Sequence, residues 1–267
     1  MFLKEALKKA LAVLGYKRRR LSDPEVNFDN FVNLARAYEQ RLSESGSFIV
    51  ANDVRIELLA GLRGTPPSEA YFILDALAKC IDVNGDVCEF GVAQGATSAL
   101  IANELQSSRE IFHLFDSFEG LPKPTGKDQL IDDVLSFGSM EAYAGTMSCS
   151  EVMVRKRLKE ISFPARRFVI HKGFIDGVLR DHTNLPGNVR FAYVDFDFYE
   201  PTKLALDFLG RATSAGAIII VDDYDFFSTG VKTAVGEFLE EINARSEVFR
   251  CSVPNTRYGC FAVLTKT

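Results

Sequence analysis

The sequence predicts an α/β protein built on a doubly wound, mostly parallel sheet, and three observations predict it. From residue 85 onward, short apolar runs alternate with helical stretches, as in a parallel sheet that is covered by helices on both faces. The chain closes on two strand-like runs joined by a turn at residues 254–257, so we expect a C-terminal antiparallel hairpin. Residues 24–82 have helical patterns, which places an N-terminal helical extension before the sheet.

Seven strands are predicted from short runs rich in Val, Ile and Phe. Five of them form the parallel part and cover Asp86–Phe90, Glu110–Phe115, Arg167–His171, Val189–Val194 and Ala217–Val221. The closing hairpin is expected from Glu247–Val253 and Tyr258–Leu264.

Helices are predicted between these strands. They cover Ala96–Gln106, Glu151–Ile161, roughly Asp176–Arg180, Thr202–Arg211 and Val231–Ala244. Ser148 and Glu151 have the spacing of a capping box, so we expect the second helix to begin there. Another helix is expected to begin at Thr65-Pro66-Pro67, before the first strand, because Pro is favoured in a first helical turn.

Composition bounds the class of protein. The chain has 267 residues, of which 47% are hydrophobic and 25% charged, the ordinary balance of a globular protein. It contains no apolar stretch of about 18 residues, so no transmembrane helix is predicted. None of its five cysteines forms a CxxC pair, which favours reduced thiols in a cytoplasmic protein over a zinc site or a disulfide framework.

Charge divides the chain into unequal parts. The first 20 residues carry seven Lys or Arg and one Glu, whereas the whole chain has a net charge of −5. An acidic body argues against nucleic acid as a partner. The apolar residues from Phe2 to Leu14 share one helical face, which predicts a basic amphipathic helix. Two interpretations stand: the helix docks on its own protein or a second subunit of a homo-oligomer, or it lies on an anionic membrane at the inner face.

The charge and the periodicity together divide the chain into a basic helix 1–20, a helical cap 21–82 and an α/β core 83–267.

A ligand-binding turn is predicted after the first strand. Glu89 stands near the end of this strand and is followed by Gly91-Val92-Ala93-Gln94-Gly95. Glycines at these positions let the backbone pass close beneath a ligand at the carboxyl edge of the sheet. Asp116 ends the second strand, where a carboxylate can accept hydrogen bonds from both ribose hydroxyls of an adenosine. Together these features predict an adenosyl site.

Carboxylates also follow the fourth and fifth predicted strands. Asp195 and Asp197 lie two residues apart, which is the spacing of one strand face, and Asp222 and Asp223 end the next strand. Because the carboxyl ends of parallel strands meet at one edge, three or four carboxylates are expected to converge. Such a cluster favours a divalent cation with oxygen ligands, such as Mg²⁺. The alternative is that each carboxylate caps the following helix.

The segments EFGVAQGAT, FDSFEGLP, VDFDFYEPT and IIIVDDY resemble the TylF/MycF family of macrocin-type O-methyltransferases, over most of residues 50–250. The resemblance implies the class I methyltransferase fold, S-adenosylmethionine as methyl donor and Mg²⁺ or another divalent cation. By position it implies metal ligation by Asp195, Asp222 and Asp223. It implies cofactor binding by Glu89, Gly91, Val92, Ala93, Gln94, Gly95, Asp116, Ser117, Phe118, Gly173, Phe174, Ile175 and Asp195. The basic N-terminal helix and the loop 123–150 are departures from the family, and that loop region normally shapes the acceptor pocket.

The resemblance implies methyl transfer to a hydroxyl of a sugar-containing small molecule. Asp197 is our candidate base, and the reverse assignment, with Asp195 as base and Asp197 as ligand, stays open because both share one face. The alternative acceptor is a catechol-type phenol. Phe198 favours the sugar acceptor, since metal-dependent catechol enzymes typically carry a lysine base shortly after their first metal aspartate. A less favoured alternative is a NAD-dependent oxidoreductase, against which the missing GxGxxG motif argues.

Overall fold

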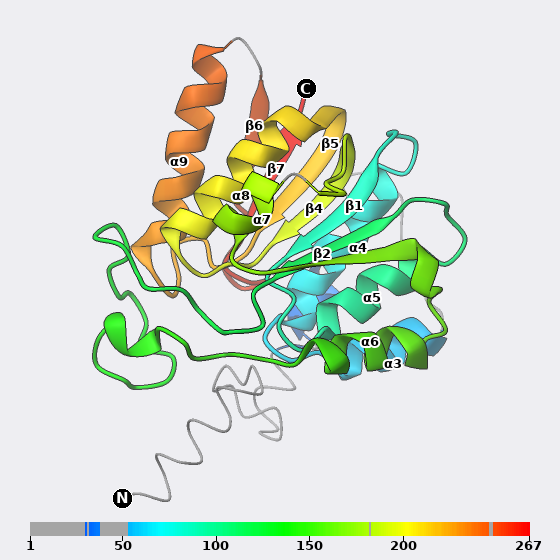
Figure 1. The fold of residues 1–267 in the computed structure, drawn as a ribbon, viewed down its shortest axis with the longest axis horizontal. Helices are drawn as coiled ribbons and strands as arrows, with labels where there is room; N and C mark the ends of the chain where they lie inside the picture. Colours follow the sequence, from blue (N-terminus) through cyan, green and yellow to red (C-terminus); the bar gives the residue numbers. More distant parts are fainter. Residues whose placement is uncertain (1–29, 31, 38–52, 182, 246–247) are drawn as a thin grey trace, which may run out of the picture.

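The computed structural model describes residues 30, 32–37, 53–181, 183–245 and 248–267 (Figure 1). Within this part of the chain, one seven-stranded sheet has the order β3-β2-β1-β4-β5-β7-β6. Strands β1 to β5 run parallel, and β7 is antiparallel to both β5 and β6. The predicted doubly wound sheet with a C-terminal antiparallel hairpin is confirmed.

The strand bounds agree closely with the sequence pattern. The strands are β1 Asp86–Phe90, β2 Phe112–Asp116, β3 Phe168–Lys172, β4 Val189–Val194, β5 Thr213–Val221, β6 Phe249–Ser252 and β7 Ala262–Lys266. Strand β5 begins before the predicted Ala217 because its first residues pair with β4 while Ser214 to Gly216 stay exposed, so they carry no apolar signal. Strand β7 begins later than the predicted Tyr258, because Tyr258 belongs to a turn and donates its N–H to the Asn255 carbonyl (2.9 Å).

Helices cover both faces of the sheet (Figure 1). Their bounds are α3 Asp53–Ala60, α4 Pro67–Lys79, α5 Ala96–Glu104, α6 Glu151–Glu160, α7 Ile175–Asp181, α8 Tyr199–Ala212 and α9 Thr229–Ala244, with 3₁₀ turns at Glu141–Tyr143 and Ala165–Arg167. Helices α7, α8 and α9 pack on one face around Phe90, Leu209 and Phe238. Helices α4, α5 and α6 pack on the other around Ile101 and Leu158.

One predicted cap and two helix starts differ from the structure. Helix α6 begins at the predicted Glu151, but its N-cap is Ser150 rather than Ser148, and the Ser150 Oγ accepts the N–H of Val152 (3.2 Å). Helix α9 begins at Thr229 rather than Val231. Helix α8 begins at Tyr199 rather than Thr202, since Pro201 fits in its first turn. The capping-box spacing therefore pointed to the right turn of chain but to the wrong serine.

The order of the strands creates a crevice. Strands β1 and β4 are neighbours, and the chain leaves them toward opposite edges of the sheet, which is the topological switch point where ligands bind in such folds. The predicted helix 1–20 and most of the cap before residue 53 lie outside the described residues. Among the helices that the structure describes, none has the length and apolarity needed to cross a bilayer.

Candidate active site

The turn after β1 passes close to the end of β4. Gly91 has a φ of +85°, and a Cβ at this position would lie 1.8 Å from the carbonyl oxygen of Asp195. The Asp195 N–H in turn donates to the Phe90 carbonyl (2.7 Å). A side chain at residue 91 is therefore excluded both by contact and by backbone conformation. The contact is with the backbone at the end of β4, whereas the sequence predicted a close approach to a ligand.

Asp116 holds this turn through its carboxylate. Its Oδ2 accepts the N–H groups of Val92 and Ala93 (both 2.8 Å), and its Oδ1 accepts the N–H of Phe118 (2.6 Å). Burial raises the pKa of Asp116, and these three donors oppose the rise. Asp116 thus ties the β1 turn to the β2 turn, in addition to lining the cavity described below.

Glu89 is a carboxyl group buried inside the protein, with 1% of its surface exposed. Neither of its carboxyl oxygens has a hydrogen-bond partner within the described part of the chain. Burial raises the pKa of Glu89 to about 8, the Ser98 hydroxyl opposes this rise, and the negative charge of Asp116 adds to it. A buried acid with so little hydrogen-bond compensation favours a nearby cationic ligand group.

A cavity of about 300 Å³ opens at the carboxyl edge of β1, β2 and β4. Ten of the predicted site residues line it, namely Gly91, Ala93, Gln94, Asp116, Ser117, Gly173, Phe174, Ile175, Asp195 and Asp197. Six others do not line it: Glu89, Val92, Gly95, Phe118, Asp222 and Asp223. Val92 and Phe118 pack into the core beneath the site instead. The cavity therefore joins the glycine turn to the aspartates after β4.

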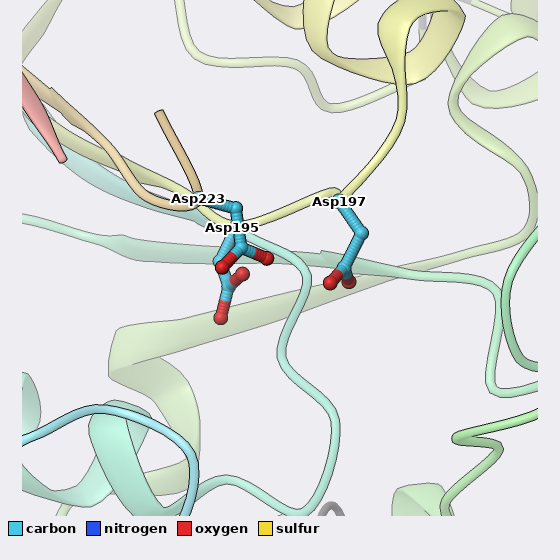
Figure 2. A group of neighbouring side chains, drawn as sticks. All are labelled: Asp195, Asp197 and Asp223. Carbon is cyan, nitrogen blue, oxygen red and sulfur yellow. The ribbon is translucent and has the colours of Figure 1, made fainter. Parts of the chain in front are cut away.

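Three aspartates gather at the ends of β4 and β5 (Figure 2), and two of them, Asp195 and Asp197, line this cavity. Asp195 and Asp197 follow β4 and Asp223 follows β5, and ligand oxygens of all three lie within 4.8 Å of one another. The register that pairs Val194 with Val221 brings the two strand ends together. Asp197 and Asp223 have φ values of +60° and +56°, a left-handed conformation that Asp adopts more readily than most residues. The turns after the strands thus decide where these carboxylates point.

Asp222 is separate from this group of three. Its Oδ2 accepts the hydroxyl of Tyr193 (2.8 Å), and its Oδ1 accepts the N–H of Asp223 (2.7 Å). Tyr193 also lies 3.2 Å from Glu69 Oε1 on α4. Of the ligand set implied by the resemblance, the structure places Asp195 and Asp223 in the cluster, while Asp222 contacts a buried tyrosine.

The cluster fits a divalent cation of the Mg²⁺ or Ca²⁺ type. Oxygens that bind one such ion at about 2.0–2.6 Å lie at most about 5 Å from one another. The three aspartates satisfy this limit, and carboxylate oxygens are the donors that these ions prefer. Asp195 and Asp197 also line the cavity, so an ion held there would face its contents.

A family comparison decides the relationship. The family model described as "Macrocin-O-methyltransferase (TylF)" matches residues 74–256, which include the glycine turn and all four aspartates. The chain belongs to this TylF family.

Known proteins similar to the chain agree with the TylF assignment. A 4'-O-methyltransferase of Streptomyces olivaceus that acts on 8-demethyl-8-(2,3-dimethoxy-α-L-rhamnosyl)-tetracenomycin C is 28% identical over 165 residues. That match spans 57% of this chain and 59% of the relative's length. The O-methyltransferase NovP has 19% identity and a TM-score of 0.63, over 91% of this chain and 99% of its own. The calicheamicin methyltransferase CalS11 has 21% identity and a TM-score of 0.59, over 91% of this chain and 93% of its own. At these identities the two structures establish the fold.

The TylF pattern did not reveal every residue that lines the cavity. Arg63, between α3 and α4, is the one basic side chain among its described lining residues. Leu121, Pro122 and Met147 form part of a wall that comes from the loop between β2 and α6, and Glu200 comes from the first turn of α8. Leu121, Pro122 and Glu200 belong to the segments FDSFEGLP and VDFDFYEPT, which drew attention for their aspartates. Arg63 and Met147 lie outside every quoted segment and reach the site only through the fold.

Proposed function

We propose that the protein transfers a methyl group from S-adenosylmethionine to a hydroxyl of a sugar-containing small molecule, with the help of a divalent cation. One observation carries the proposal: a single cavity is bounded by the Gly91 turn and Asp116 on one side and by Asp195 and Asp197 on the other. A methyl donor and a cation-bound hydroxyl would meet there.

The β1 and β2 edge would hold the donor. We assign the ribose to Asp116 and the methionine portion to the Gly91–Gly95 turn. The buried Glu89 carboxyl does not line the cavity, but its charge would act through the protein on the positive charge of the amino acid portion. Arg63 lines the same cavity, and we assign it to the methionine carboxylate, with which a guanidinium forms charge-assisted hydrogen bonds.

The β4 and β5 edge would carry the reaction. Asp195 and Asp223 belong both to the sequence-based ligand set and to the structural cluster, and we propose them as ligands of the cation. A bound divalent cation lowers the pKa of an alcohol and fixes its direction of attack. Asp197 lies in the cluster and lines the cavity, and we propose that its carboxylate accepts the proton of the acceptor hydroxyl.

Asp222 is proposed as the third ligand of the cation. Its carboxylate already accepts a hydrogen bond from Tyr193, so a cation would compete with that hydroxyl. The Tyr193→Phe variant removes the hydroxyl that donates to Asp222. If Asp222 binds the cation, Tyr193→Phe should leave Mn²⁺ affinity unchanged or raise it, and Asp222→Asn should lower it about tenfold. If Asp222 only braces the Asp223 backbone, Asp222→Asn should bind Mn²⁺ within threefold of the natural protein.

The acceptor is proposed to be a deoxysugar such as a rhamnosyl group. The tetracenomycin relative acts on a rhamnosyl compound, and a solved structure of CalS11 is described as a TDP-rhamnose 3'-O-methyltransferase. The apolar wall of Leu121, Pro122 and Met147 suits the methyl group of such a sugar or an apolar aglycone. Methyl α-L-rhamnoside and TDP-rhamnose are the two probes that separate a glycoside from a sugar nucleotide.

Chelation tests the metal dependence. With methyl-labelled S-adenosylmethionine and either rhamnosyl probe, EDTA should abolish transfer of label and Mg²⁺ should restore it. Asp223→Asn should be inactive in both conditions while binding S-adenosylhomocysteine normally. Full transfer of label in the presence of EDTA would remove the cation from the proposal and leave the methyl transfer intact.

The N-terminal predictions need a separate test. We propose that residues 1–20 serve association rather than chemistry. Their removal should either reduce the size of a homo-oligomer in light scattering or abolish binding to anionic vesicles. Vesicle binding should weaken with salt, because exposed charges act through a screened field.

A further inference from the structure

One buried carboxylate fastens the loop 121–150 to the rest of the protein. Asp128 is 6% exposed. Its Oδ2 accepts the N–H and the hydroxyl of Thr125 (2.7 and 2.8 Å), and its Oδ1 accepts the backbone N–H of Tyr199 (2.7 Å). A buried charge is retained only when such donors compensate its loss of water. Asp128 therefore joins a turn of its own loop to the first residue of α8.

Helix α8 depends on this distant residue for its cap. Its N-cap residue is Phe198, which provides no side-chain hydrogen bond. The carboxylate of Asp128 supplies that acceptor from 71 residues earlier in the chain. A negative charge at this position also stabilises the positive end of the helix dipole.

The capped segment is the turn that carries Asp197. The Phe198 N–H donates to the Phe196 carbonyl (2.6 Å), so Asp197 stands at the centre of a three-residue turn with a φ of +60°. The hydroxyl of Ser228 donates to the Asp197 carbonyl (3.0 Å) and lies 3.5 Å from Asp128 Oδ1. The turn is thus held at its centre by Ser228 and at its end by Asp128.

The close approach leaves room for nothing larger than hydrogen at residue 230. A Cβ on Gly230 would lie 1.9 Å from Asp128 Oδ1 and 2.6 Å from the Tyr199 nitrogen. Gly230 is in the first turn of α9, so the starts of α8 and α9 meet on one carboxylate. The glycine is needed here for space, since its φ is not in the left-handed region.

The same loop also forms part of the cavity. Leu121 and Met147 line it, and the loop is packed on Phe198 and Phe227 through a small apolar cluster that includes Tyr143. The position of the cavity wall and the position of the Asp197 turn are therefore linked through Asp128 and this cluster.

We propose that Asp128 is a positioning residue. It holds the Phe196–Tyr199 turn so that the Asp197 carboxylate faces Asp195, Asp223 and the acceptor. The inference rests on the proposed function, because that function gives Asp197 its role. Asp128 does not line the cavity and acts through the backbone of the turn. Loss of its side chain should move Asp197 while the cofactor edge of the sheet stays intact.

Binding of Mn²⁺ alone tests the proposal without an acceptor. The Asp197 carboxylate lies in the acidic cluster, so its negative charge contributes to cation binding even though we assign it as base rather than ligand. In the full-length protein, Asp128→Ala should therefore weaken Mn²⁺ binding about tenfold by calorimetry. Amide hydrogen exchange in residues 196–200 should accelerate, and the affinity for S-adenosylhomocysteine should stay within twofold. Gly230→Ala should reproduce these changes, since its methyl group would displace the same carboxylate.

Two control variants separate positioning from general loop docking. Asp128→Asn keeps an oxygen that can accept the Tyr199 N–H, so it should recover most of the Mn²⁺ affinity. Lys127→Met removes the exposed contacts of Lys127 with Tyr199 Oη and Glu237 Oε1 but leaves the turn untouched. It should therefore bind Mn²⁺ within twofold of the natural protein.

The outcomes are decisive. Normal Mn²⁺ affinity and normal exchange in Asp128→Ala would overturn the proposal, as would equal losses in Asp128→Ala and Lys127→Met. A variant that loses S-adenosylhomocysteine affinity together with Mn²⁺ affinity would also contradict it, because Asp128 would then support the fold as a whole. Failure of the natural protein to bind Mn²⁺, or unchanged binding in Asp223→Asn, would instead refute the cation site of the proposed function.

Discussion

The crevice has carboxylates at two places, the ends of β1 and β2 and the ends of β4 and β5, and their negative charges are arranged differently. At the β1 and β2 edge, Asp116 is neutralised by three backbone N–H groups from turns beside it. At the β4 and β5 edge, three aspartates gather with their oxygens within 4.8 Å of one another. Asp116 is thus compensated by neutral donors, whereas the second edge places like charges together, which favours a bound ion. The difference teaches that carboxylates at neighbouring strand ends can be arranged in different ways: one is held by backbone donors, and three lie close to one another.

The comparison is tested most strongly at Asp197. Asp197→Asn should lower methyl transfer to a rhamnosyl probe about 10²- to 10⁴-fold, the range for loss of a general base. The affinity for S-adenosylhomocysteine, measured by calorimetry, should not change. The matched control is Asp176→Asn, which also lines the cavity but whose carboxylate pairs with Arg180 (2.7 Å). If Asp197→Asn and Asp176→Asn retain equal activity, Asp197 has no special role.

The second prediction concerns Glu89 and pH. Its folded pKa of about 8 lies above the ordinary value of 4.5, so the folded protein keeps a proton that the unfolded chain releases. The stabilisation is therefore complete below pH 4.5 and is lost as pH rises to about 8, and it amounts to about 5 kcal/mol. Chemical denaturation of the cofactor-free protein across this range should show the decline, and Glu89→Gln should flatten it.

At low pH, His171 also changes the free energy of unfolding and so overlaps with the effect of Glu89. Burial, and then His113, lowers the pKa of His171 from 6.5 to about 4. This stability contribution is lost as pH falls from 6.5 through 4. The informative quantity is therefore the difference between the natural protein and Glu89→Gln at each pH. A difference that stays constant from pH 5 to 8 would contradict the raised pKa.

The third prediction concerns Asp116, at the β1 and β2 edge. Asp116→Ala should weaken binding of S-adenosylmethionine and S-adenosylhomocysteine by about 1.5–3 kcal/mol, the cost of losing charge-assisted hydrogen bonds. Calorimetry with both ligands measures it. Asp116→Asn keeps one acceptor oxygen and should lose less. Mn²⁺ affinity should be unaffected, and a parallel loss of Mn²⁺ binding would mean that the two edges are not independent.

The smallest effect is expected at Arg63. Arg63→Met should weaken S-adenosylhomocysteine binding about tenfold, or ~1.4 kcal/mol, because the methionine carboxylate loses its counter-charge. Binding of 5'-methylthioadenosine, which lacks the amino acid portion, should be the same in both proteins, and Arg63→Lys should lose less than Arg63→Met. Equal losses for the two ligands would place Arg63 at the adenosine instead.

Much of the β1 and β2 edge could be predicted from the sequence, because its signals are local. The bounds of β1 and β4 match the apolar runs, and the need for glycine at residue 91 was visible in the motif. Asp116 was recognised at the end of its strand, although its bonds to the Val92 and Ala93 amides were not. Side-chain alternation and strand ends depend on nearest neighbours, which a single sequence contains.

The arrangement of carboxylates at the β4 and β5 edge was decided by tertiary structure. The sequence placed four aspartates after two strands, but turns with positive φ at Asp197 and Asp223 determine where those side chains point. Asp222 contacts Tyr193 because the register of β4 and β5 brings that hydroxyl within reach. Arg63 reaches the cavity, and Asp128 the start of α8, from distant segments. Local patterns determine which residues end each strand, whereas contacts between residues far apart in the chain determine which of them meet.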